Sequence, residues 1–228
     1  MNNSIYKLFE SNRRILYYLL QRNIMSIDES IINQLNIQNQ WRNFLYFSPQ
    51  IRPFFNEQQR REIEGELLQI NDNISTHFDE LCLMGENDSY ISDLIRRDSV
   101  EEFITFCTQT NTSVNSYINH SIFETNSYLI NKTPSLIEYA AFFGSIQIFQ
   151  YLKLSGAELN PSLWMYVIHG KNSELVHILE ENNIIPENGN YIDCYKEAVK
   201  CHHNDIANYI FNSFLNPENE ILSFGFRF

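Results

Sequence analysis

The second half of the chain repeats itself, and this repeat constrains the fold more than any other feature. Pro134-Ser135-Leu136 returns as Pro161-Ser162-Leu163, 27 positions later, and apolar residues follow at the same offset. A third copy lies 58 positions after the first and has Ala198-Val199 where the first has Ala140-Ala141. A period of a few tens of residues is typical of stacked helix pairs, because one pair alone cannot bury its hydrophobic face. The repeat therefore predicts an all-α fold of helical hairpins.

A weaker copy precedes these three. A shift of 45 positions aligns Asn111 on Gly156. Asn is the commonest replacement for Gly where the backbone turns left-handed after a helix, so this exchange is physically reasonable. The excess of 45 over 27 residues is assigned to an inserted loop near residues 116–132. We therefore expect about four helix pairs in residues 86–228, of which the first is degenerate.

The first 85 residues are predicted to form a separate helical segment. Apolar residues at helical spacing predict a helix over residues 5–20, and Ser26-Ile-Asp-Glu29 fits a capping box that opens a second helix. Pro49 and the proline four residues later end that second helix, because proline has no N–H to donate. A third helix is expected from about Asn56 to Ile74. The residues expected to face inward on it are Ile63, Leu67, Leu68 and Ile74.

Charge and hydropathy narrow the classes of partner. The formal net charge is −12, whereas nucleic acids and anionic membranes require clustered Lys and Arg. No apolar run approaches the roughly 20 residues that cross a bilayer. The apolar stretch Ile15–Leu20 is too short for a signal core, and no small-residue cleavage site follows it. We therefore expect a cytoplasmic protein that binds neither nucleic acid nor membrane.

The residue types that catalyse reactions or bind metals show neither a catalytic nor a metal-binding pattern. The four cysteines, Cys82, Cys107, Cys194 and Cys201, have no paired spacing and are expected to be reduced and buried. Cys194, Cys201, His202 and His203 suggest zinc only weakly, because metal sites favour Cys pairs separated by two to four residues. A helix end with a buried thiol is the favoured interpretation. No nucleophile elbow, phosphate-binding loop or His-Glu-x-x-His motif is present, so we expect no enzyme, no metal and no cofactor.

The repeat unit resembles a known family. Ser135-Leu-Ile-Glu-Tyr-Ala-Ala-Phe-Phe-Gly144, followed by Ile148 and Leu152 and then Gly156-Ala157, is similar to the ankyrin repeat. That family's consensus has Thr-Pro-Leu-His before Ala-Ala, so Glu138 stands here in place of the consensus His. The sequence from about residue 85 to residue 210 is most similar to the large set of ankyrin-repeat proteins expanded in parasitic protists. The resemblance implies a helical solenoid that binds proteins, without established catalytic activity.

The resemblance also implies which residues contact a partner. In ankyrin repeats the two variable positions between Ala-Ala and Gly lie exposed on the concave face. The positions carried over are Phe142 and Phe143, His169 and Gly170, Lys200 and Cys201, and, in the degenerate copy, Arg96 and Arg97. Two exposed phenylalanines would form a hot spot, since aromatic side chains bury a large area. Alternatively, they pack against the inserted loop. Trp164 is either a core residue or a further contact.

We therefore expect a protein–protein interaction scaffold. Three alternatives stay open: an adaptor that recruits a larger complex through its N-terminal helices, an enzyme with a cleft between the two segments, and a homo-oligomer. The last would use the Phe-rich tail, residues 211–228, whose simplest role is to cap the final repeat.

Overall fold

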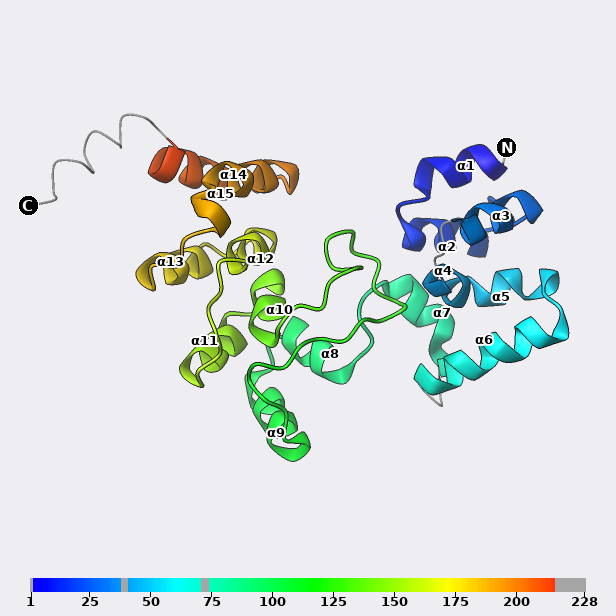
Figure 1. The fold of residues 1–228 in the computed structure, drawn as a ribbon, viewed down its shortest axis with the longest axis horizontal. Helices are drawn as coiled ribbons and strands as arrows, with labels where there is room; N and C mark the ends of the chain where they lie inside the picture. Colours follow the sequence, from blue (N-terminus) through cyan, green and yellow to red (C-terminus); the bar gives the residue numbers. More distant parts are fainter. Residues whose placement is uncertain (1, 38–40, 71–73, 216–228) are drawn as a thin grey trace, which may run out of the picture. The chain divides into compact units, whose positions relative to one another are not determined.

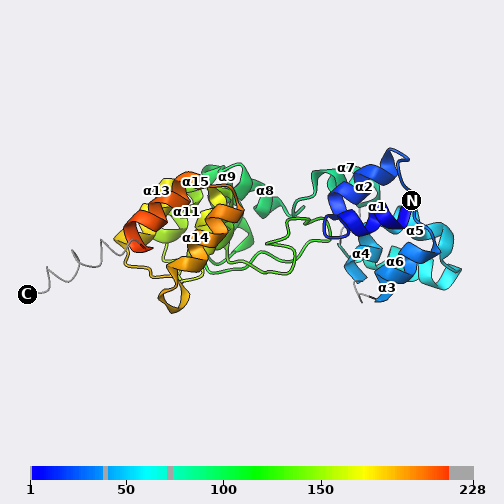
Figure 2. The ribbon, with the colours of Figure 1, turned by 90° about the horizontal axis from the view of Figure 1, so that it is seen from above.

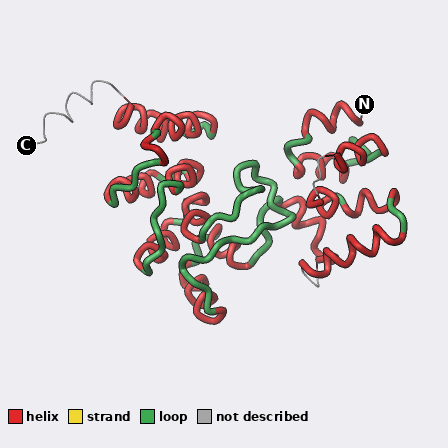
Figure 3. The backbone as a smooth tube through the Cα atoms, in the orientation of Figure 1, coloured by secondary structure: helices red, strands yellow, loops and turns green. Residues whose placement is uncertain are grey.

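The protein is helical throughout the part that can be described. The computed structural model describes residues 2–37, 41–70 and 74–215. Within these ranges the chain forms fifteen α-helices and no strand (Figure 3). One isolated antiparallel bridge joins Tyr117 to Ser135. The prediction of an all-α fold is confirmed for these residues.

The chain divides into two compact units. Unit 1 combines Met1–Ser89 with Asn119–Thr133, and unit 2 combines Tyr90–Ile118 with Pro134–Phe228. Most of the insertion expected near residues 116–132 therefore packs with the N-terminal helices.

Unit 1 contains seven of the helices (Figure 1). They are α1 (Asn2–Phe9), α2 (Arg13–Gln21), α3 (Glu29–Ile37), α4 (Trp41–Tyr46), α5 (Ser48–Ile51), α6 (Glu57–Ile70) and α7 (Ile74–Met84), with the 3₁₀ turn η1 (Arg52–Phe54) after α5. Pro49 lies in the first turn of α5, where the N–H that proline lacks has no partner within the helix. The proline expected to end the second predicted helix therefore also begins a short helix of its own.

The core of unit 1 is aromatic and holds the insertion in place. Tyr17 and Tyr46 are buried and meet edge to face, with ring centroids 5.6 Å apart. The buried guanidinium of Arg13 lies 5.0 Å from the Tyr46 ring and donates to the carbonyl of Glu124 in the insertion. The fully buried ring of Phe123 packs edge to face on Phe78. The carbonyl and the ring face offset part of the cost of burying this cation, and the hydrogen bond to Glu124 anchors the insertion to the helices.

The N-terminal helices differ from the expectation in their boundaries. The helix expected over residues 5–20 is broken, because α1 ends at Phe9 and the side chain of Asn12 accepts a hydrogen bond from the Ile15 N–H at 3.0 Å. Asn12 thereby caps α2. The apolar spacing continues across the break because residues of both helices pack against one core.

The start of α3 also differs. Asp28, not Ser26, caps it, since its carboxylate accepts from the Ile31 N–H at 3.0 Å. The Ser26 hydroxyl instead accepts from the side chain of Asn2. The predicted capping box at this position is wrong.

The helix expected over residues 56–74 is shorter, and a further helix follows it. α6 ends at Ile70 and the unpredicted α7 begins at Ile74. Ile63 is buried and Leu67 partly buried, as expected, whereas Leu68 is 57% exposed. The inward orientation expected for Ile74 concerns a side chain outside the described residues.

Unit 2 is a series of four helix pairs. They are pair 1, α8 (Tyr90–Arg96) with α9 (Val100–Thr110); pair 2, α10 (Leu136–Phe143) with α11 (Ile146–Leu154); pair 3, α12 (Leu163–Gly170) with α13 (Ser173–Glu181); and pair 4, α14 (Tyr191–Lys200) with α15 (Asn204–Ile210). The 3₁₀ turn η2 (Glu187–Gly189) precedes α14, and the π-helical turn η3 (Phe211–Leu215) follows α15. The first helices contact one another in chain order, α8 with α10, α10 with α12 and α12 with α14 (Figures 1 and 2).

The same turn joins the two helices of every pair. One residue with positive φ ends the first helix, and the next residue is the N-cap of the second. The positive-φ residues are Asp98 (51°), Gly144 (68°), Lys171 (52°) and His202 (58°), and the N-caps are Ser99, Ser145, Asn172 and His203. A one-residue left-handed turn reverses the chain tightly, which allows the two helices to lie side by side.

Three of the four second helices, α9, α11 and α13, are followed by a left-handed residue as well. These residues are Asn111 (φ 53°), Gly156 (φ 89°) and Asn183 (φ 54°). The prediction that Asn111 replaces Gly156 at a left-handed helix end is confirmed. At the start of α10, Ser135 is the N-cap and forms a full capping box with Glu138.

The beginning of the apolar tail packs on pair 4. Phe214 stacks on Tyr191 with centroids 4.1 Å apart and meets Trp164 edge to face at 5.9 Å. The remainder of the tail, residues 216–228, lies outside the described residues. Among the residues described, no helix combines the length and apolar character that crossing a bilayer requires.

Candidate functional site

The two phenylalanines expected to be exposed in pair 2 are not. Phe142 is only 7% exposed, and Phe143 is partly buried. The imidazole of His169 stacks on Phe142 with centroids 4.8 Å apart, and Phe143 packs on Tyr139 at 4.8 Å. Phe142 is covered because α12 of the next pair contributes His169, whose ring stacks on it.

The two arginines of pair 1 differ from each other. The side chain of Arg96 is 10% exposed, and its guanidinium donates to the Tyr139 hydroxyl at 3.0 Å, which links pairs 1 and 2. Arg97 stays partly exposed and pairs with Asp93 at 2.9 Å. Arg97 is therefore available at the surface, whereas Arg96 mainly holds two pairs together.

Trp164 and Lys200 lie in opposite environments. Trp164 is 0% exposed, and its indole N–H donates to the Ile184 carbonyl at 2.7 Å, so it belongs to the core. A contact with a partner would require the core to open. Lys200 is exposed, and its ammonium contacts the Glu197 carboxylate at 3.1 Å.

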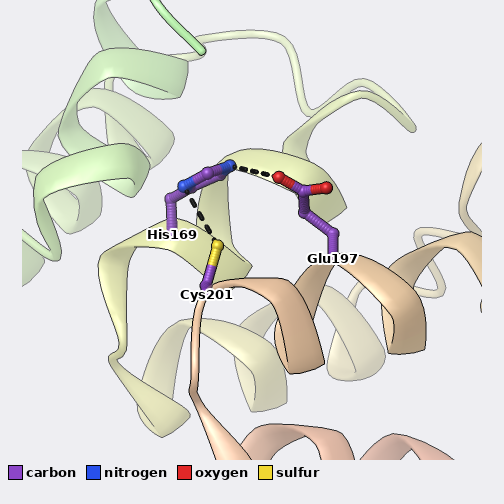
Figure 4. Close-up of side chains that lie close together, drawn as sticks. All are labelled: His169, Glu197 and Cys201. Atoms are coloured by element: carbon purple, nitrogen blue, oxygen red, sulfur yellow. Dashed lines mark hydrogen bonds and ion pairs between the residues drawn. The ribbon is translucent and has the colours of Figure 1, made fainter. Parts of the chain in front are cut away.

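Three residues of unit 2 with metal-binding or catalytic potential lie together (Figure 4). His169 comes from the end of α12, and Glu197 and Cys201 come from the last turn and the C-cap of α14. The His169 Nδ1 lies 3.5 Å from the Cys201 Sγ, and its Nε2 lies 3.1 Å from the Glu197 Oε1. One ligand atom from each residue lies within 4.8 Å of the others, and all three side chains are partly buried.

The surroundings favour one protonation pattern. The carboxylate of Glu197 beside Nε2 favours a proton on that nitrogen, which leaves the Nδ1 lone pair facing the thiol. The ammonium of Lys200 neutralises part of the Glu197 charge. Burial raises the pKa of the Cys201 thiol, Glu197 raises it further, and Lys200 opposes both. The thiol is thus in its neutral form and can donate to Nδ1.

This arrangement is compatible with three roles, which are catalysis, metal binding and the joining of two helices. Thiol, imidazole and carboxylate follow in the order of a nucleophile, a base and an orienting acid. However, Cys201 follows the last turn of α14, where the helix dipole disfavours a thiolate, and its pKa is raised. The nitrogen and sulfur are also ligands of soft divalent metals. Finally, the contacts join α12 to α14 and stabilise the stacking of pairs 3 and 4.

The sequence singles out two of the three members of this cluster, His169 and Cys201, as variable positions of consecutive repeats, but not Glu197. The zinc hypothesis combines Cys201 with Cys194, His202 and His203 instead of His169. Cys194 is buried elsewhere on α14, and the missing member is His169, 32 residues away in the chain. The repeat alignment is the available signal, because the two variable positions of one repeat lie beside those of the next in a stack. Cys82, Cys107 and Cys194 are buried and free, as expected, whereas Cys201 is partly buried.

Unit 1 has a groove of its own. It encloses about 750 Å³ between α5, α6 and α7, and its apolar lining includes Phe55, Ile63, Leu67, Leu68 and Phe78. An ion pair of 2.7 Å between Arg52 and Glu64 lies at the same groove.

Comparison with known protein families, curated proteins and solved structures found no match to this chain.

Proposed function

We propose that unit 2 is an ankyrin-like solenoid that acts as a non-catalytic protein-binding scaffold. The observation that carries this proposal is a hydrogen bond that recurs at two of the three junctions between consecutive pairs. The Ser145 hydroxyl donates to the Ile95 carbonyl at 2.6 Å, and the His203 imidazole meets the Ile168 carbonyl at 2.7 Å. Donor and acceptor occupy equivalent repeat positions in both cases. A bond between equivalent positions of neighbouring units is expected in a stack where each unit contacts its neighbours.

Further contacts between pairs support the same arrangement. At the position equivalent to Ser145, the Asn172 amide donates to the carbonyl of Gly144 at 3.2 Å. Glu138, which stands where the ankyrin consensus has His, accepts from the Ser162 hydroxyl of the next repeat at 2.6 Å while it caps its own helix. The carboxylate thus supplies a link between repeats by a different donor–acceptor pair.

The partner surface that we propose runs along the exposed side of α14 and includes Lys200. Ile192 and Val199 are exposed and lie seven residues apart, so both project from one side of the helix. Exposed apolar side chains beside a flexible cation suit a protein partner with an apolar contact rimmed by carboxylates. Arg97 offers a second exposed cation in pair 1, one residue before the left-handed turn at Asp98.

Affinity capture with mass spectrometry tests this proposal. The bait is the full chain, compared with the double variant Val199→Ser, Lys200→Glu. The matched control is Leu154→Ser, which removes a residue that is 85% exposed at the end of α11. We expect a protein that is held by the wild type and by the control and lost from the double variant. Identical sets of captured proteins for all three baits would contradict the proposed surface.

The adaptor alternative has one observation of its own, the apolar groove of unit 1. Leu68 lies in its wall and is 57% exposed, so a hydrophobic helix could bury it. If unit 1 recruits a different partner, Leu68→Ser will lose a captured protein. The double variant Val199→Ser, Lys200→Glu will still capture that protein. If Leu68→Ser retains every captured protein, the adaptor alternative is wrong.

A further inference from the structure

We propose that Cys201 and His169 bind a divalent thiophilic metal of the Zn²⁺ class, with Glu197 holding His169 in its metal-binding tautomer. This goes beyond the scaffold function, and it departs from the expectation of no metal that the sequence alone suggested. The three residues come from consecutive helix pairs, so the metal would join pair 3 to pair 4.

The separation of the two ligand atoms fits a metal. The His169 Nδ1 and the Cys201 Sγ are 3.5 Å apart. Tetrahedral Zn²⁺ has Zn–S bonds of about 2.3 Å and Zn–N bonds of about 2.0–2.1 Å, which places two ligand atoms about 3.5 Å apart. The metal can therefore bridge the two atoms without a movement of α12 relative to α14.

The third residue provides the support that metal-binding histidines usually have. A histidine that binds through one nitrogen almost always donates its other N–H to a carboxylate, a carbonyl or water. Glu197 lies 3.1 Å from Nε2, on the side of the ring away from the thiol. Lys200 contacts both oxygens of that carboxylate, and Phe142 stacks on the imidazole, so both the acid and the ring plane are fixed in advance.

The binding step is an exchange of a proton for a metal ion. The thiol S–H bond breaks, its proton passes to solvent, and the sulfur lone pair forms the S–metal bond, while Nδ1 donates its lone pair. No oxidant or reductant is involved. The two remaining positions of a tetrahedral ion are taken by water in the isolated protein.

Co²⁺ is a suitable probe, because a thiolate ligand gives an absorption band that water and carboxylate ligands do not. The reduced, full-length protein is titrated with Co²⁺ and compared with Cys201→Ser, His169→Gln and Glu197→Gln. The matched control is His177→Gln, since His177 also lies 3.1 Å from a glutamate, Glu180, but has no thiol partner in that contact.

We expect a saturable thiolate-to-cobalt band with one ion per chain in the wild type and in His177→Gln. The band is lost in Cys201→Ser and His169→Gln, and Glu197→Gln weakens binding by about 10-fold to 100-fold. Absence of the band from the wild type at excess Co²⁺, or its persistence in Cys201→Ser, overturns the proposal.

A second measurement uses only the wild type and so does not depend on the folding of any variant. Zn²⁺ is added before a limited exposure to iodoacetamide, and the labelled cysteines are identified by peptide mass spectrometry. We expect Zn²⁺ to lower the labelling of Cys201 and to leave that of Cys107 unchanged. Equal labelling of Cys201 with and without Zn²⁺ means that the cluster is only a hydrogen-bonded link between helices.

Discussion

A Cβ atom on Gly170 would lie 2.1 Å from the carbonyl oxygen of Ala141. α10 and α12 therefore approach each other backbone to backbone at this point, closer than any side chain on Gly170 allows. The approach is reciprocal, because a Cβ on Gly144 would lie 2.6 Å from the Gly170 carbonyl oxygen. The repeat position expected to face a partner is instead a contact between pairs 2 and 3.

Gly170→Ala is expected to destabilise unit 2. The added methyl group overlaps backbone atoms that no rotamer change can move, so the pairs must separate, at a cost of about 3 kcal/mol. Urea unfolding followed by circular dichroism measures this loss. Gly65→Ala is the contrasting variant, because nothing lies within 4 Å of its Cβ position and Gly65 is inside α6. It should gain about 0.5–1 kcal/mol. Equal stability of Gly170→Ala and the wild type would contradict the close approach.

Ser145→Ala is expected to cost about 1–3 kcal/mol. The hydroxyl of Ser145 is buried and donates to the carbonyl of Ile95 in the preceding pair, so its removal leaves a buried acceptor without this donor. The control is Ser155→Ala at the exposed end of α11, where we expect a change of at most about 0.5 kcal/mol. If both variants unfold at the same urea concentration, the link between the pairs contributes nothing.

Asp98 should tolerate asparagine better than alanine. Its carboxylate accepts from the backbone N–H groups of Gln147 and Ile148 at 3.0 and 2.9 Å and so caps the first turn of α11 in the next pair. Its own φ is 51°, a conformation that asparagine adopts readily and alanine does not. We expect a loss of about 2 kcal/mol for Asp98→Ala and about half of that for Asp98→Asn. Thermal unfolding that ranks the two variants in the opposite order would contradict this role.

Stability is expected to fall at alkaline pH. Burial, and to a smaller extent Asp193, raise the pKa of the Cys194 thiol from 9.0 to about 12. Burial likewise raises the pKa values of Tyr17 and Tyr46 above 10.0. These groups stay protonated in the folded chain while the unfolded chain ionises. The contribution of Cys194 is therefore complete below pH 9 and is lost as the pH rises from 9 towards 12, whereas that of the two tyrosines is complete below pH 10 and falls above it. Each group loses about 1.4 kcal/mol per pH unit within its own range.

Urea unfolding at pH 8 and at about pH 10.5 measures this dependence. Cys194→Ala removes one of the titrating groups, so its stability should decline less steeply over the same interval. A free energy of unfolding that is equal at both pH values would show that these groups titrate alike in the folded and unfolded chains.

The turns of unit 2 were predictable in part from sequence. Gly144, Gly156 and Asn111 indicate a left-handed helix end by residue type, and the structure has one at each. Lys171 adopts the same conformation although lysine does not favour it, and so does His202, whose residue type adopts it less readily than glycine. The alignment of both residues on Gly144 is the clearer indication of the turn.

The candidate site was less predictable, because its members lie on different pairs. Phe142 is buried by a ring that belongs to the following repeat, and a pattern within one repeat cannot indicate that. Trp164 is covered by Phe214, 50 residues later. In unit 1, the side chain of Asn12 ends one apolar run and begins another without any change in hydrophobic spacing. Each of these features depends on a contact distant in sequence.

The binding of a captured partner tests the scaffold proposal most directly. Isothermal titration calorimetry measures the affinity of the purified partner for three chains. These are the wild type, the double variant Val199→Ser, Lys200→Glu and the control Leu154→Ser. We expect the double variant to bind at least about tenfold more weakly, a difference of about 1.4 kcal/mol, and Leu154→Ser to bind like the wild type. Equal affinity of all three chains for the partner would contradict it.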